Sequence, residues 1–272
     1  MSITSTVPTA AGRGAKRRLS SLFSLELVLG VLSIGAIAFL WEYAKPLGIP
    51  VLRNLPSISE IVQASKGLFA SSLYWDGWLL SLERITAGFL LAQLFGIPIG
   101  LAMAMHRATF ETTFPVVEIL RPIPPVAWIP ISILFWPTRE LSVLFIVFLG
   151  AFWIVLLNTM GGASNIDINY KRAALSLGST PRHMFWRIIL PATIPSIITG
   201  MAVGMGIAWE MVVSAEMVAG RTGLGYLLWQ SFQNNAIAQV IVCMISIGLS
   251  GYVSSQIIRL LGYYVAPWQR QH

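Results

Sequence analysis

Long apolar runs are the feature that most restricts how this chain can fold. Several runs of about 20 residues carry almost no charge, which is the length an α-helix needs to cross the hydrocarbon core of a bilayer. Of the 272 residues, 56% are hydrophobic and 11% are charged, whereas soluble domains carry about 25% charged residues. The sequence therefore predicts an all-α integral membrane protein.

About six transmembrane segments are expected, each close to membrane length. The first is too long for a signal peptide, whose apolar core spans about 7–15 residues. The expected segments are residues 22–40, 78–105, 113–136, 141–163, 184–216 and 237–262. We expect four regions along the chain: a disordered cytoplasmic tail (1–22), a first span with an outer segment (23–77), a core of five spans (78–262) and a second cytoplasmic tail (263–272).

The third segment is too rich in proline to form one unbroken helix. Each proline removes a backbone N–H and clashes with the preceding turn. Irregular backbone at membrane depth is tolerated only where protein or a wet cavity surrounds it. The prolines are Pro122, Pro124, Pro125 and Pro130. A break is therefore predicted here.

The basic residues predict the orientation, because Lys and Arg concentrate on the cytoplasmic side of membrane proteins. Of the 18 Lys and Arg residues, five lie on the membrane face opposite the N-terminus, and two, Arg84 and Arg121, lie within spans. The remaining eleven share the face of the N-terminus: Arg13, Lys16, Arg17, Arg18, Arg107, Lys171, Arg172, Arg182, Arg187, Arg259 and Arg270. Both termini and the loop 164–187 are therefore expected in the cytoplasm.

The loop 164–187 contains a short amphipathic helix, expected at about 168–180. Ala173, Ala174 and Leu177 fall at helical spacing, so they are expected to share one face. Gly178 provides a helix stop, and Pro181 prevents simple continuation. The pattern predicts a small apolar face available to a partner, although a basic loop that only obeys the orientation rule would also fit.

Charged and large aromatic side chains inside the spans are the next candidates for function, because charge at membrane depth is costly unless it is paired or hydrated. Arg121 could pair with Glu118 or line a path. Glu210 and Glu216 could likewise be structural or line a path, and Trp128 and Trp209 are more often packing residues. Small-residue spacings, Gly96-x-x-x-Gly100 and Gly200-x-x-x-Gly204, predict close helix packing within one bundle.

The loop resembles the coupling segment of binding-protein-dependent ABC importer permeases. Its pattern is Ala173-Ala174, Gly178 and Ile188-x-Leu190-Pro191, with Arg172 where the family usually has a leading Glu. Further strings are similar to the nitrate/sulfonate/taurine/bicarbonate branch of that family. They are Ser81-Leu82-x-Arg84, the run from Arg121 to Pro130, Ser214 to Met217, and Gly223-Leu224-Gly225.

The resemblance implies a type I ABC importer (MetI-like) fold with a cytoplasmic coupling helix, located in a bacterial inner membrane. It implies four kinds of partner: ATP-binding subunits that hold ATP and Mg, a second permease copy forming a homodimer, an extracytoplasmic solute-binding protein, and membrane lipid. It assigns coupling to Lys171, Arg172, Ala173, Ala174, Leu177, Gly178, Ile188, Leu190 and Pro191. The expected path and gate residues are Arg121, Trp128, Trp209, Glu216, Gly223 and Gly225.

The sequence contains no motif that indicates catalysis, nucleotide binding or metal binding. It has no P-loop motif, and His106, His183 and His272 are too scattered to suggest a metal site. No bound cofactor is expected, and the basic residues flank spans instead of forming a nucleic-acid surface. Two other classes stay open: an ion-coupled secondary transporter, which would need inverted repeats, and a membrane-embedded enzyme, which would need a catalytic cluster.

Overall fold

The computed structural model describes residues 28–30, 32, 33, 35–43 and 55–267, and these contain helices and no strand. The predicted tail at 1–22 lies outside the described residues, as do residues 268–272 of the C-terminal tail. The chain divides into two compact units, Met1–Gln63 and Ala64–His272, with the boundary inside helix α2 (Ile58–Phe69). In the first unit, Glu42 Oε2 accepts a 2.6 Å hydrogen bond from the Ile58 N–H at the start of α2.

The second unit is a helical bundle. A 3₁₀ turn at Pro125–Trp128 precedes α5, and a π-helical turn at Phe185–Ile189 joins α8 to α9. Its α-helices in chain order are α3 (Ser72–Met105), α4 (Arg107–Leu120), α5 (Ile129–Phe135), α6 (Arg139–Ser164), α7 (Ile168–Ser176), α8 (Pro181–Met184), α9 (Leu190–Val218), α10 (Leu224–Gln233) and α11 (Ile237–Val265).

Four helical stretches in the described residues are long and apolar enough to cross a membrane: α3, α6, residues 181–218 and α11. A fifth arises if α4 and the segment 125–135 count as one span. These correspond to five of the predicted segments. The first predicted segment lies partly outside the described residues, where only a shorter apolar helix within Val28–Tyr43 is seen. At the other end, α11 continues to Val265, past the predicted boundary at residue 262.

The proline-rich third segment is broken, as predicted. Helix α4 ends at Leu120, and the helical segment that starts at Pro125 is bent by 84° relative to it. Pro124 precedes the 3₁₀ turn with an extended backbone (ψ 131°), because the ring of the following proline disfavours the helical region.

The core lies between α3, α6 and α9, and small residues allow these helices to approach closely. A Cβ added to Gly96 of α3 would lie 3.2 Å from Val155 Cγ1 of α6, and one on Gly100 would lie 2.6 Å from Leu156 O. A Cβ on Gly200 of α9 would lie 2.8 Å from Asn158 Cβ. Both predicted small-residue pairs therefore pack within one bundle, with α6 between α3 and α9.

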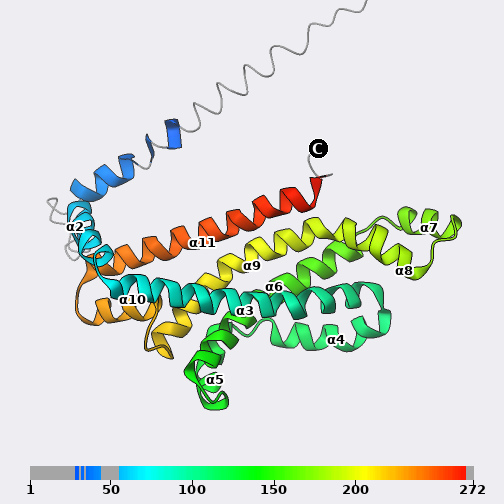
Figure 1. Cartoon of the computed structure of the whole chain (residues 1–272), viewed down its shortest axis with the longest axis horizontal. Helices are drawn as coiled ribbons and strands as arrows, with labels where there is room; N and C mark the ends of the chain where they lie inside the picture. Colours follow the sequence, from blue (N-terminus) through cyan, green and yellow to red (C-terminus); the bar gives the residue numbers. More distant parts are fainter. Residues whose placement is uncertain (1–27, 31, 34, 44–54, 268–272) are drawn as a thin grey trace, which may run out of the picture. The chain divides into compact units, whose positions relative to one another are not determined.

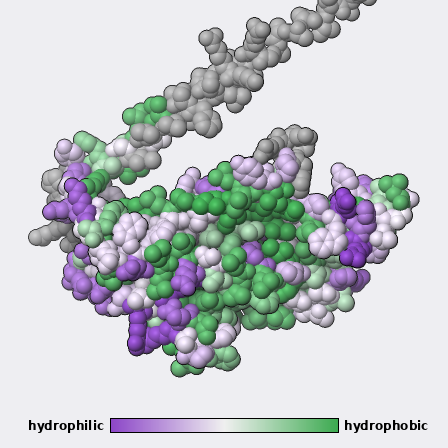
Figure 2. Space-filling view, viewed as in Figure 1, coloured by the Kyte–Doolittle hydropathy of each residue, from purple (hydrophilic) through white to green (hydrophobic). Residues whose placement is uncertain are grey.

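Helix α9 lies between α6 and α11, with α7 and α8 at one end of the bundle and α10 at the other (Figure 1). We refer to these as the α7 end and the α10 end. On the face shown in Figure 2, hydrophobic residues cover the middle of the long helices, and hydrophilic residues gather around α7 and α8. An apolar middle with polar ends is the surface expected of helices that cross a bilayer.

Candidate functional site

Helix α7 is a short helix with defined caps at both ends. Asp167 begins it, and its Oδ1 accepts a 2.9 Å hydrogen bond from the Asn169 N–H. At the other end Gly178 has φ +75°, a left-handed conformation that glycine adopts without the steric cost of a Cβ. Its N–H donates to Leu175 O at 3.0 Å. The predicted helix stop at Gly178 is confirmed.

The predicted apolar face of α7 is divided in the structure. Ala174 is buried against the rest of the chain, whereas Ala173 is exposed and Leu177 is 86% exposed. Arg172 is also exposed, and Lys171 is half-buried. The loop helix thus presents Leu177 to its surroundings and uses Ala174 to pack inward.

The segment after α7 is firmly attached to the bundle. Ile188, Leu190 and Pro191 are half-buried where the π-helical turn joins α9. Between them, Ile189 packs in one buried cluster with Leu101 of α3 and Ala163 of α6. The segment that follows the loop therefore packs against α3 and α6 and continues into α9.

A polar cluster at the α10 end joins α3, α6, α9 and the loop 219–223. At its centre is Arg84 of α3, whose side chain is 4% exposed. The guanidinium donates to Glu140 of α6 from Nε (2.6 Å) and Nη2 (2.7 Å). Nη1 donates to Glu216 Oε1 of α9 (2.7 Å) and to Thr222 O (2.8 Å). We call Ser81, Arg84, Glu140, Glu216 and Thr222 the Arg84 node.

Glu216 is fully buried and every oxygen of its carboxylate has a donor. Ser81 Oγ lies 2.8 and 2.9 Å from its two oxygens, and the Gly225 N–H donates to Oε2 at 2.9 Å. Ser81 Oγ in turn accepts from the Leu224 N–H at 2.9 Å. A buried charge needs such complete pairing, because an unpaired one is strongly destabilising.

Glycine is required where the loop 219–223 meets this carboxylate. Gly223 has φ +116°, and a Cβ there would overlap the carboxylate of Glu216. A Cβ on Gly225 would lie 2.6 Å from Val213 O. Both glycines therefore allow the start of α10 to approach the end of α9.

The six residues predicted for path and gate fall in three places. Glu216, Gly223 and Gly225 meet at the Arg84 node. Trp209 is 2% exposed between α9 and α11, where its Nε1 donates to Ser254 Oγ at 3.0 Å. Arg121 is exposed and Trp128 half-buried, and both flank the break after α4.

Two functional features were not predicted. Arg84 and Ser81 stand in one of the quoted strings, yet nothing in that string reveals that they meet Glu216 more than 130 positions away. The second feature is a row of serines at i, i+4 and i+8 on α11. Ser246, Ser250 and Ser254 bind Tyr74 OH (2.7 Å), Trp78 Nε1 (2.9 Å) and Trp209 Nε1, respectively. That spacing is a readable signal for a polar helix contact.

The described residues contain no group of three or more His, Cys, Asp or Glu side chains that could hold a metal ion. The only carboxylates brought to the Arg84 node are Glu140 and Glu216, and Arg84 bridges them. The Arg84 node is suited to holding α3, α6 and α9 together.

Comparisons with known proteins agree on one family. Residues 96–271 match the family described as "Binding-protein-dependent transport system inner membrane component". An ABC transporter permease protein of Methanocaldococcus jannaschii is 37% identical over 250 residues, which cover 90% of this chain and 93% of the relative. The nitrate import permease protein of Synechocystis is 27% identical, with 95% and 96% covered. The taurine transport system permease protein of Escherichia coli is 29% identical, with 87% and 89% covered.

Solved structures of two transporters share the fold. A chain of the inward-facing MetNI methionine ABC transporter aligns with a TM-score of 0.57 at 17% identity, covering 72% of this chain and 95% of that one. A chain of a bacterial ABC transporter that imports alginate aligns with a TM-score of 0.56 at 15% identity, covering 91% and 99%. The all-helical fold of type I ABC importer permeases, predicted from the sequence, is confirmed.

Proposed function

Because the chain belongs to the family of binding-protein-dependent transport system inner membrane components, we propose that it forms the membrane path of an ATP-driven importer for a small polar solute. The observation that carries this proposal is α7. It is a capped surface helix that ends at Leu177, which is 86% exposed, and the segments on either side of it, at Ile166 and Met184, pack in the cluster around Ile189 with α3 and α6. Such a helix can fit a cleft of an ATP-binding subunit and move the bundle when that cleft closes.

The partners proposed are two ATP-binding subunits, which would bind and hydrolyse ATP with Mg, an extracytoplasmic binding protein and a second copy of this chain. In this arrangement the α7 end and both termini lie in the cytoplasm, and the α10 end faces outward. The excess of basic residues on the N-terminal face supports this orientation. The apolar surface of the long helices would be covered by lipid or by the second copy.

The solute proposed is small and anionic or zwitterionic. Support comes from the named relatives, which import nitrate and taurine, and from a bicarbonate transport system permease of Synechococcus elongatus, 29% identical over 74% of this chain and 72% of that relative. The loop 219–223, held by Arg84 and Glu216, would act as the outer gate. Its release from the node would open the α10 end.

Leu177→Asp tests the docking of α7. Leu177 is exposed within the chain, so a charge there leaves the fold intact but would be buried unpaired in an apolar cleft, which is costly. We expect the importer, reconstituted with its ATP-binding subunits and binding protein, to lose both ATP-driven uptake and solute-stimulated ATP hydrolysis.

Leu177→Met is the matched control, because it keeps an apolar side chain of similar volume and should preserve uptake. Gly178→Pro is a second test: it removes the N–H that donates to Leu175 O and cannot adopt φ +75°. It should insert in the membrane but abolish transport. Normal uptake by Leu177→Asp or Gly178→Pro would reject the docking of α7.

A further inference from the structure

Glu210 is a carboxylate in the membrane-spanning part of α9 that the bundle leaves unpaired. Its side chain is exposed, and the described residues give it neither an ion pair nor a side-chain hydrogen bond. It lies eight residues before the last residue of α9 at Val218, or about 12 Å along the helix. An ionisable side chain at this depth is normally found facing the bundle interior or a water-filled cavity.

Glu210 belongs to one stripe of α9, which we call the Glu210 stripe. It consists of Thr199, Val203, Gly206 and Glu210, at spacings of four, three and four residues, so these side chains share one face. Between Thr193 and Met217, the exposed residues of α9 are Thr199, Val203 and Glu210 alone. The remaining faces pack inside the bundle, with Gly200 against α6 and Trp209 against α11.

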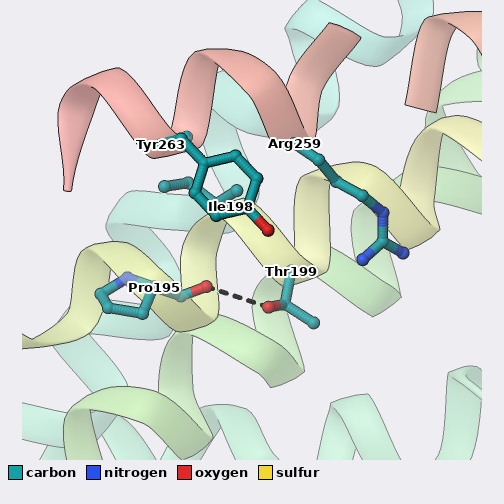
Figure 3. Close-up of a pocket in the computed structure, with 6 residues that line it drawn as sticks. Pro195, Ile198, Thr199, Arg259 and Tyr263 are labelled. Atoms are coloured by element: carbon teal, nitrogen blue, oxygen red, sulfur yellow. Dashed lines mark hydrogen bonds between the residues drawn. The ribbon is translucent and has the colours of Figure 1, made fainter. Parts of the chain in front are cut away.

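The stripe opens at its α7 end into a hollow between α9 and α11 with a volume of about 120 Å³. Thr199 lines it together with Arg259 and Tyr263 of α11 (Figure 3). The Thr199 hydroxyl donates to Pro195 O at 3.0 Å, and Arg259 has no ion pair among the described residues. Polar groups therefore stand at both ends of the stripe, whereas the exposed residues of α3 between Gly88 and Pro98 are all apolar: Leu90, Leu94, Phe95 and Pro98.

We infer that the Glu210 stripe is a water-accessible wall of the translocation path, and that Glu210 favours solutes carrying a cationic group over simple anions. This rests on the proposed function, because it takes the chain to be the path of an importer. A carboxylate lowers the electrostatic potential around it, and the effect is strongest where water is confined. Zwitterions with an ammonium group fit this wall better than nitrate or bicarbonate, which offer no positive group.

Charged thiol reagents can test water access and charge together. Cys243 is the only cysteine and is buried, so Cys243→Ala gives a background without thiols. Into it we would place Val203→Cys, with and without Glu210→Gln, in the importer reconstituted with its ATP-binding subunits. The probes are two membrane-impermeant methanethiosulfonates, one ending in a trimethylammonium group and one in a sulfonate.

The expected result is that the thiol of the Val203→Cys variant reacts with both reagents and that the cationic one reacts faster. Val203 lies seven residues from Glu210, or about 10 Å along the helix, where Coulomb's law in water predicts that Glu210→Gln reduces the ratio of the two rates by about fourfold. Leu94→Cys is the matched control. Leu94 is 63% exposed against 43% for Val203, but its exposed neighbours on α3 are Leu90, Phe95 and Pro98, so the thiol introduced there should not react.

Three outcomes would overturn the inference. An unreactive thiol in the Val203→Cys variant would mean that protein or lipid covers the stripe. Equal reaction of the Leu94→Cys variant would mean that exposure alone is being measured, and an unchanged rate ratio in Glu210→Gln would remove the charge preference. Labelling reports water access whether or not solute moves, while ATP-driven uptake by the same vesicles tests the proposed function, so the two failures can be told apart.

Discussion

The Arg84 node stabilises the charge on Arg84. Replacing Arg84 alone should therefore destabilise the protein more than replacing Arg84 and Glu216 together. Arg84→Met would leave Glu216, which is fully buried, without its counter-charge. Breaking a buried pair from one side costs about 3–5 kcal/mol. We expect a large fall in the unfolding temperature of the purified protein, measured in detergent, and a partial recovery in Arg84→Met/Glu216→Met.

A surface pair provides the comparison for that experiment. Arg107 and Glu111 are joined at 2.6 Å, four residues apart on α4, with side chains 92% and 59% exposed. Such pairs contribute little, since water and salt screen them. Arg107→Met should therefore leave the unfolding temperature unchanged. If Arg84→Met behaved in the same way, the node would have no role in stability.

Gly223 gives a second prediction at the level of one residue. Gly223→Ala places a Cβ where the Glu216 carboxylate lies and requires an L-residue at φ +116°, so it should destabilise the protein and displace the loop 219–223. Gly161→Ala is the control, because a Cβ at Gly161 of α6 meets no atom within 4 Å and alanine favours a helix over glycine by up to about 1 kcal/mol. Thermal unfolding of both variants in detergent checks the contrast; equal stability would show that the loop adapts to the added methyl group.

At the scale of the element, α11 is attached to the bundle by hydrogen bonds as well as by packing. Three of its serines, Ser246, Ser250 and Ser254, accept hydrogen bonds from aromatic side chains of α3 and α9. Hydrogen bonds between membrane helices contribute about 0.6 kcal/mol on average, with a maximum near 1.7. A double-mutant cycle with Trp209→Phe and Ser254→Ala should give a coupling energy in this range from detergent unfolding. Strictly additive effects would show that the contact at 3.0 Å adds nothing beyond packing.

The elements that local rules control were predictable, and the contacts between elements were not. Proline density alone predicted the break after Leu120, and a glycine in a basic loop predicted the end of α7, since both effects act within one or two turns. The partners of Arg84 depend on how α3, α6 and α9 pack. Arg84 and Glu216 are 132 positions apart, so no spacing rule connects them. The sequence left a path role and a structural role open for Glu216, which is fully buried.

At the scale of the whole molecule, the long helices connect the α7 end with the α10 end, the two places that move in the proposed transport cycle. The cluster around Ile189 joins the α7 end to α3 and α6, and the node joins α3, α6 and α9 at the α10 end. With 29 residues, α9 alone extends about 43 Å. Suppose that the gate at the α10 end and nucleotide binding at the α7 end are coupled to the same two conformations. A substitution that destabilises one conformation at either end then shifts the conformational equilibrium at the other end by the same free energy.

Thr222→Val tests that linkage while leaving the buried ion pair intact. Thr222 Oγ1 accepts from Arg84 Nη2 at 3.2 Å, and a hydrogen bond to a charged group contributes about 1.5–3 kcal/mol. Loss of this bond should weaken the hold of the node on the loop 219–223 and favour the open gate. In the reconstituted importer we expect faster ATP hydrolysis without binding protein, by about tenfold, the factor to which the lower end of that range corresponds.

The matched control is Thr112→Val on α4, since the Thr112 hydroxyl donates only to backbone carbonyls of its own helix, Ala108 O at 2.9 Å and Thr109 O at 3.2 Å. Thr112→Val should hydrolyse ATP at the unaltered rate. Thr222→Val could also leave the rate of ATP hydrolysis unaltered while the loop 219–223 becomes accessible to protease. In that case the gate would open without any effect on α7. The node would then stabilise the fold at the α10 end without belonging to the transport cycle.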